Sequence, residues 1–152
     1  MRYLLDSDSL SDLYEPESPG YHNIMGRAIA LPETDRIVIS ILALYELEYG
    51  YANAPESLKP VLRNRISAIQ GESPILSLNL EAARIFGSLK VRLQSLRQLS
   101  SKAIKAHNMD IMLAATAIIE GCTLISGDGI YSDLQQLDPT LRVENWLKPG
   151  TS

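Results

Sequence analysis

Short apolar runs alternate along this chain with longer segments in which apolar residues recur every three or four positions. The short runs are typical of buried strands, and the longer segments are typical of amphipathic helices. Strands that alternate with helices favour a parallel sheet that is covered by helices on both faces. We predict strands at residues 3–5, 37–39, 75–78 and 123–125, with a weaker candidate at 141–143.

Asn and Gly residues mark the ends of the predicted helices. An Asn side chain can accept hydrogen bonds from the first turn of a helix, and Gly readily adopts the left-handed conformation that ends one. The segment 16–32 is interrupted by Pro and Gly, and the segment 99–108 is expected to be a connection. Three helices are well marked: residues 58–69 with a stop at Gly71, residues 81–96 capped by Asn79, and residues 109–120 between Asn108 and Gly121.

The length of 152 residues suits one domain with a single core. We expect this domain to span residues 1–148 and the last residues, 149–152, to be frayed. Hydrophobic residues make up 45% of the chain and charged residues 21%, which excludes a disordered tail, a collagen-like fibre and a coiled-coil rod. The sequence shows neither a signal peptide nor an apolar run of about 20 residues, so we expect a cytoplasmic protein.

The charges are unevenly distributed, although the net charge is only −4. Residues 82–109 include no acidic side chain and hold six of the fourteen basic ones. This strip is either a phosphate-binding surface or an ordinary solvated helix face, and the sequence leaves both open. Its basic residues are Arg84, Lys90, Arg92, Arg97, Lys102 and Lys105.

Two carboxylates directly follow predicted strands. Asp6 comes after the first strand, and Asp128 follows the fourth after Ser126 and Gly127. In an open parallel sheet, ligands bind beyond the carboxyl ends of the strands, so both residues have a functional position. Each residue alone could equally cap a turn.

Two further carboxylates fall on apolar faces of predicted helices. Asp110 is followed at helical spacing by Leu113, Ala114 and Ala117, a stripe that should face the sheet, unless this first-turn residue stays in solvent. Glu46 lies in a nearly apolar segment, 42–47, of the helix after the second strand. An unpaired buried carboxylate costs several kcal/mol, so these groups need a proton, a partner or a cation.

All four carboxylates are expected at one edge of the sheet. Their mutual repulsion would raise their pKa values unless they share a multivalent cation. One Cys and two His cannot build an internal disulfide or an ordinary four-ligand zinc site. Oxygen ligands alone select hard ions, so Mg²⁺ or Mn²⁺ is the expected metal at Asp6, Glu46, Asp110 and Asp128.

At these positions the chain resembles a PIN domain of the VapC type, the toxin ribonuclease of type II toxin–antitoxin pairs. The resemblance extends over nearly the whole chain and rests on several motifs in order. They are Leu5-Asp6-Ser7-Asp8-Ser9-Leu10-Ser11-Asp12-Leu13, Tyr45-Glu46-Leu47-Glu48-Tyr49-Gly50, Glu81-Ala82-Ala83-Arg84-Ile85-Phe86-Gly87, Asp110-Ile111-Met112-Leu113-Ala114-Ala115, Gly121-Cys122-Thr123-Leu124-Ile125-Ser126-Gly127-Asp128 and Arg142-Val143-Glu144-Asn145-Trp146.

The resemblance implies a three-layer α/β/α fold around a short parallel sheet. It also implies that the four carboxylates hold one or two Mg²⁺ or Mn²⁺ ions that cleave RNA, as a metal-dependent endoribonuclease does. Ser7 and Ser126 would then support the carboxylates by hydrogen bonds, with Asp8 beside them. The RNA-binding candidates are Lys90, Arg92, Arg97, Lys102 and Lys105.

The same resemblance implies two protein partners, a cognate antitoxin and a second copy of the chain in a homodimer. Five apolar residues are candidates for the antitoxin surface, although each could equally belong to the core. They are Leu10, Leu13, Tyr14, Tyr49 and Tyr51.

Two departures from the family pattern keep a second hypothesis open. Asp8 and Gly127 stand where the family usually has Asn, which motivates a catalytically impaired scaffold that binds RNA or a partner. His107 is expected to be a surface loop residue, although it could touch substrate. A phosphoacceptor receiver domain is disfavoured, because residues 123–138 contain neither the Lys nor the Arg that such a site requires.

Overall fold

A five-stranded, fully parallel sheet forms the centre of the computed structural model, which describes residues 1–149. Its strand order is β3-β2-β1-β4-β5, so β1 occupies the middle. The predicted strands are all confirmed, but the third is shorter than expected because the chain leaves the sheet after Leu76 to enter the next helix. The strands are β1 (Arg2–Leu5), β2 (Arg36–Ser40), β3 (Ile75–Leu76), β4 (Thr123–Ile125) and β5 (Arg142–Glu144).

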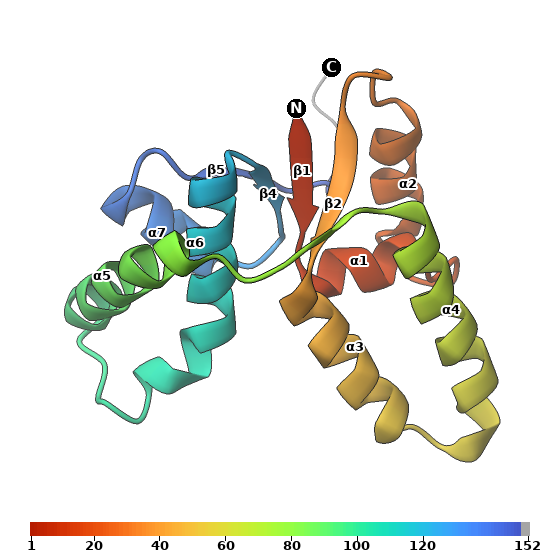
Figure 1. The fold of residues 1–152 in the computed structure, drawn as a ribbon, viewed down its shortest axis with the longest axis horizontal. Helices are drawn as coiled ribbons and strands as arrows, with labels where there is room; N and C mark the ends of the chain where they lie inside the picture. Colours follow the sequence, from red (N-terminus) through yellow and green to blue (C-terminus); the bar gives the residue numbers. More distant parts are fainter. Residues whose placement is uncertain (150–152) are drawn as a thin grey trace.

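Helices cover both faces of this sheet, as Figure 1 shows. The first four α-helices lie on one side and the last three on the other. They are α1 (Ser7–Leu13), α2 (Tyr21–Ile29), α3 (Ile41–Ala52), α4 (Lys59–Glu72), α5 (Leu80–Arg97), α6 (Asn108–Glu120) and α7 (Ile130–Leu137), with short 3₁₀ helices η1 (Glu56–Leu58) and η2 (Ile104–His107). The expected three-layer α/β/α fold is therefore confirmed.

Alternate residues of the central strands build the two halves of the core. Successive side chains of a strand point to opposite faces, so one row packs under α5–α7 and the next under α1–α4. The first row consists of Leu4, Val38 and Leu124, and the second of Leu5, Ile39 and Ile125. Both faces of these strands are buried, which explains why they appear in the sequence as continuous apolar runs.

The predicted helix ends are partly confirmed. Asn79 caps α5, since its side-chain oxygen accepts a 2.8 Å hydrogen bond from the backbone nitrogen of Glu81. Gly121 ends α6 with a positive φ of 66°. The stop at Gly71 is wrong, because α4 continues through this residue to Glu72 without needing a left-handed conformation there.

The predicted cap at Asn108 is also wrong. Asn108 is the first residue of α6 and makes no capping hydrogen bond with its side chain. The connection before it contains the 3₁₀ helix η2, which runs directly into α6, and the Asn108 backbone nitrogen donates to the carbonyl of Lys105. A backbone acceptor thus takes the role that the sequence assigned to a side chain.

Two further predictions concern the C-terminal residues and the absence of a membrane-spanning segment. Of the segment 149–152 that was expected to fray, residues 150–152 lie outside the described residues. No helix in residues 1–149 combines the length and the apolar character that crossing a membrane requires.

Candidate active site

The carboxyl edge of the sheet carries Asp6, the most buried of the four predicted carboxylates. Asp6 follows β1 directly, and its extended backbone conformation places it at the N-cap of α1. One carboxylate oxygen, Oδ1, accepts a 2.8 Å hydrogen bond from the backbone nitrogen of Ser9. Burial raises the pKa of Asp6, although hydrogen bonds from Ser126 and Ser9 work in the opposite direction.

Ser126 links the ends of two neighbouring strands, β1 and β4. Its buried hydroxyl donates a 2.5 Å hydrogen bond to Oδ2 of Asp6 and accepts a 3.0 Å one from the backbone nitrogen of Asp128. Asp128 is exposed, and its Oδ1 accepts a hydrogen bond from the backbone nitrogen of Ile130 at the start of α7. The two strand-end carboxylates are therefore joined through one hydroxyl group.

Asp110 approaches the same edge from the first turn of α6. Leu113, Ala114 and Ala117 are buried, as the apolar stripe predicts, while Asp110 itself is only half-buried. Burial raises the pKa of Asp110, and the negative charge of Asp128 raises it further. His107, which we expected to be a surface loop residue, is half-buried at the end of η2, and its Nδ1 lies 3.6 Å from Oδ2 of Asp110.

Glu46, the fourth predicted carboxylate, lies on α3. It follows buried Leu42 and Ala43 by one turn of α3, but its own side chain is exposed, so the expected apolar face ends before Glu46. The Ser7 hydroxyl donates a 2.7 Å hydrogen bond to Oε1 of Glu46. Since Ser7 follows Asp6 in the chain, this contact ties α3 to the start of α1 at the acidic edge.

Tyr131 is a residue of the site that the sequence did not reveal. Its side chain is 1% exposed, and its hydroxyl lies 3.5 Å from Oδ1 of Asp110. Burial raises the pKa of Tyr131, and the charges of Asp110, Asp6 and Asp128 raise it further. The hydroxyl therefore lies in a negatively charged environment, with Asp110 as its hydrogen-bond partner. The feature of the sequence that could have identified Tyr131 as a site residue is its position three residues after Asp128.

An open cavity of about 490 Å³ marks the acidic edge. Four aspartates line it, including Asp8, which is exposed, and Asp12, which the sequence did not single out. Its other lining residues are Ser11, Gly127 and Leu147. The cavity is open and strongly acidic, which suits a cationic ligand better than an apolar one.

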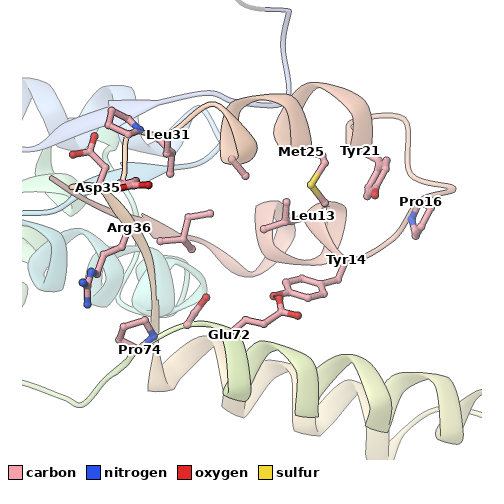
Figure 2. Close-up of a pocket in the computed structure, with 15 residues that line it drawn as sticks. Leu13, Tyr14, Pro16, Tyr21, Met25, Leu31, Asp35, Arg36, Glu72 and Pro74 are labelled. Atoms are coloured by element: carbon pink, nitrogen blue, oxygen red, sulfur yellow. The ribbon is translucent and has the colours of Figure 1, made fainter.

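A larger cavity lies elsewhere, between α1, α2 and the start of β2 (Figure 2). Its volume is about 900 Å³, and its walls include Leu13, Tyr14, Met25 and Leu31. None of the four predicted carboxylates lines it. We therefore assign the chemistry to the smaller acidic cavity, which two of the four, Asp6 and Asp128, line.

The donor chemistry of the acidic edge suits a hard divalent cation. Carboxylate and hydroxyl oxygens are the ligands that Mg²⁺ and Mn²⁺ prefer, and a nearby cation would offset the cost of burying Asp6 and Asp110. The side chains do not form a closed ligand shell, since within residues 1–149 no three or more Asp, Glu, His or Cys side chains are grouped to hold an ion. The carboxylates therefore fit a divalent cation by their donor chemistry and by their position along this edge of the sheet.

The five RNA-binding candidates fall into two groups. Arg92 donates to the carbonyl of Leu137, and Arg97 forms a 2.5 Å ion pair with Asp133, so both connect α5 to α7. The Nζ of Lys90 lies 5.5 Å from the ring centre of Phe86 on its own helix. The second group, Lys102 and Lys105, is exposed in the segment that leads from α5 to Asp110.

The candidate antitoxin residues differ in their exposure to solvent. Leu10 and Leu13 are buried in the core between α1 and the sheet, so of the two alternatives left open for them the core one is correct. Tyr49 is 72% exposed on α3. Tyr51 is half-buried, and the Arg63 guanidinium lies 4.1 Å from its ring centre. Tyr14 is half-buried between two cavities and donates a hydrogen bond across to Glu72.

Comparisons with known proteins agree with this geometry. The chain is 24% identical over 148 residues to Ribonuclease VapC2 of Rickettsia felis, which covers 97% of this chain and 100% of that protein. Its fold is similar to VapBC2 of Rickettsia felis bound to a promoter DNA fragment, with a TM-score of 0.74, 21% identity, and 96% and 99% of the two chains covered. It is equally similar to VapBC-1 of nontypeable Haemophilus influenzae, with a TM-score of 0.74, 20% identity, and 97% and 100% covered.

A family model described as the PIN domain matches residues 3–137, which span the sheet strands β1 to β4 and all seven α-helices. The match includes all four carboxylates and Tyr131. Because it covers most of the sequence, this chain belongs to the PIN-domain family.

Proposed function

We propose that this protein is a metal-dependent endoribonuclease that hydrolyses RNA phosphodiester bonds and acts as the toxin of a toxin–antitoxin pair. The observation that carries the proposal is the position of Asp6 and Asp128 at the carboxyl ends of β1 and β4, where the Ser126 hydroxyl joins them, with Asp110 at the same edge beside the Tyr131 hydroxyl. Such a concentration of carboxylates is unfavourable without a cation. The similarity to Ribonuclease VapC2 of Rickettsia felis supports RNA as the substrate.

Asp6, Glu46, Asp110 and Asp128 would hold one or two divalent ions, with Mg²⁺ or Mn²⁺ as our choice. Such an ion supplies a nucleophilic water at neutral pH and positive charge for the phosphoryl oxygens. The chain fixes the ligands in advance: Ser126 and the Ser9 backbone nitrogen hold both oxygens of Asp6. In this proposal Ser7 orients Glu46 by the hydrogen bond that the two residues share.

The test is RNA cleavage by Asp6→Asn and Asp110→Asn with Mg²⁺ or Mn²⁺ present. Both variants should lose cleavage while retaining the far-ultraviolet circular dichroism of the parent, because each keeps its shape and loses its charge. Glu33→Gln is the matched control, since Glu33 is an exposed carboxylate in the connection before β2. Full activity in both Asp variants would refute the nuclease.

A second candidate is a PIN-domain scaffold that binds RNA or a partner without cleaving. The exposure of Glu46 favours it, because this carboxylate is turned to Ser7 and the four carboxylates are not grouped around one point. Asp8 adds a further negative charge that raises the pKa of Asp6. Titration calorimetry with Mn²⁺ separates the two candidates, since a scaffold without a working site should bind no ion there.

The protein partner that we propose is an antitoxin, as in the VapBC complexes of similar fold, and it would meet this chain in the cytoplasm. A cavity of about 350 Å³ between α1, α3 and α4 lies directly beside Glu46 and Ser7. Tyr14 lines both this cavity and the larger one in Figure 2, so the two form adjacent sections of one surface. An extended or helical segment could follow that surface and bring a basic side chain to the acidic edge.

Gly50→Leu tests this surface. Gly50 lines the cavity beside Glu46, and an added Cβ there meets no atom within 4 Å, so the larger side chain should fill the cavity without disturbing the fold. Gly87→Leu is the control, because Gly87 is equally unobstructed on α5. We expect weaker binding of the protein encoded beside this gene only for the Gly50 variant. Equal binding by both variants would place the antitoxin elsewhere.

A second copy of the chain is the other partner that we propose. Leu80 is 90% exposed at the start of α5, and Leu78, two residues before it, is also exposed and lines an apolar cavity of about 230 Å³ between α5 and α6. Exposed apolar patches of this kind often mark protein interfaces. Leu80→Lys should shift the mass in solution from dimer to monomer, whereas Ile29→Lys on α2 should not. A monomeric parent protein would refute the homodimer.

A further inference from the structure

We propose that the hydroxyl group of Tyr131 is a positioning group that fixes the carboxylate of Asp110 for divalent-cation binding. The inference rests on the proposed function and extends it to a residue of this chain that supplies no charge. It concerns the hydroxyl oxygen alone, because a Phe ring would fill the same space in the core.

The ring and the hydroxyl group of Tyr131 lie in different surroundings. The ring is buried with Leu4, Leu124 and Leu134 in the core on the α5–α7 side of the sheet. The hydroxyl emerges from that core at the acidic edge, 3.5 Å from Oδ1 of Asp110. Core packing therefore needs the ring, while the oxygen has another role.

A buried hydroxyl without a hydrogen-bond partner costs about 1–3 kcal/mol. The Tyr131 hydroxyl avoids that cost by donating to Asp110. A tyrosine hydroxyl has an ordinary pKa of about 10, so it keeps its proton at neutral pH and remains a donor. A neutral donor in this place can hold a carboxylate without competing for a cation.

The consequence is a fixed orientation for Asp110. Its Oδ1 faces Tyr131, and its Oδ2 lies 3.6 Å from the imidazole Nδ1 of His107. Asp110 lies in the first turn of α6 and is only half-buried, so core packing alone does not hold its carboxylate in one rotamer. Loss of the hydroxyl would free the carboxylate to turn to solvent. Loss of such a supporting hydrogen bond typically weakens metal binding about 10-fold to 100-fold.

Tyr131→Phe tests the inference, with Mn²⁺ titration calorimetry as the main measurement. We expect the dissociation constant for Mn²⁺ to rise about 10-fold or more. The shape of the thermal unfolding curve should stay the same as in the parent. Tyr3→Phe is a closely matched control, because the Tyr3 hydroxyl also lies 3.5 Å from an aspartate, Asp35, at the other end of β1 and away from the acidic edge. It should leave Mn²⁺ binding unchanged. RNA cleavage by the Tyr131 variant should recover at saturating Mn²⁺, which a collapsed site would not allow.

Equal Mn²⁺ affinity in the parent and in Tyr131→Phe would overturn the positioning role and leave the proposed nuclease intact. Equal losses in the Tyr131 and Tyr3 variants, or a cleavage defect that saturating Mn²⁺ does not reduce, would overturn it as well. A parent protein that binds no Mn²⁺ would instead refute the proposed function itself. The titrations and the cleavage assay together distinguish these four results.

Discussion

Ser126 donates a 2.5 Å hydrogen bond to Asp6, which joins the end of β4 to the end of β1 beneath the acidic cavity. Even with this bond, burial keeps the pKa of Asp6 above its ordinary value. The negative charge of Asp6 is therefore unfavourable in the folded, metal-free protein. A site that binds a cation requires such a charge, so function and metal-free stability conflict at this residue.

Asp6→Asn should stabilise the metal-free protein at pH 7. An Asn oxygen can still accept from the Ser9 nitrogen and cap α1, while the buried charge is removed. We expect a gain of about 0.5–2 kcal/mol in the free energy of unfolding, the range common for changes that relieve a functional site. Urea unfolding in the presence of a chelator measures it, with exposed Glu33→Gln as the neutral control. A loss of stability of that size would show that Asp6 is stabilising as a carboxylate.

The same residue predicts a specific pH dependence. In the unfolded chain the pKa of Asp6 is 3.8, and in the folded protein it is higher. Its contribution to stability is therefore complete below pH 3.8 and is lost as the pH rises through the folded-state pKa. The stability difference between Asp6→Asn and the parent should be small at the acidic end and grow as the pH increases to neutral. Measuring the two proteins in parallel cancels the other titrating groups, and a difference that shrinks with rising pH would contradict the sign.

Local sequence signals predicted the strands well because both faces of the central strands are buried. Leu4 and Leu5 belong to opposite halves of the core, so the run that contains them is apolar throughout. The errors at Gly71 and Asn108 have a different origin. Gly permits a left-handed helix end without requiring one, and Asn can cap only where the preceding backbone leaves the helix nitrogens free.

The sequence predicted the site only in part, for a related reason. Asp6 and Asp128 were found because a residue that follows a parallel strand must lie at the carboxyl edge. The exposure of Glu46 depends on the direction in which α3 leaves the sheet, which helical periodicity does not fix. Tyr131 escaped notice because a ring at helical spacing has the pattern of a core residue, and its hydroxyl acquires a role only where α6 and α7 meet.

Two glycines should respond oppositely to substitution by Ala. Gly121 ends α6 with φ of 66°, where an added Cβ costs about 1–2 kcal/mol. Gly26 lies within α2, and a Cβ there would meet no atom within 4 Å, so Ala should add about 0.5–1 kcal/mol of stability. Thermal unfolding of Gly121→Ala and Gly26→Ala measures both effects. Equal shifts of the same sign would contradict this account of the two backbones.

The basic strip should separate into residues that bind RNA and residues that hold helices together. Lys102 and Lys105 are exposed beside the segment that leads to Asp110, so we assign them to phosphate contacts. Arg97 is paired with Asp133 of α7, so its loss should reduce stability by no more than about 1 kcal/mol and leave RNA affinity unchanged.

The salt dependence of RNA binding distinguishes these roles. For a single-stranded RNA, each lost phosphate contact lowers the slope of log affinity against log salt by about 0.7. The double variant Lys102→Ala/Lys105→Ala should therefore reduce the slope by about 1.4, whereas Arg97→Ala should retain the parent slope. Cleavage-deficient Asp110→Asn is the background for these measurements, so that the RNA stays intact. An unchanged slope in the lysine variant would place the RNA backbone on another face of the molecule, because neither lysine would then contact a phosphate.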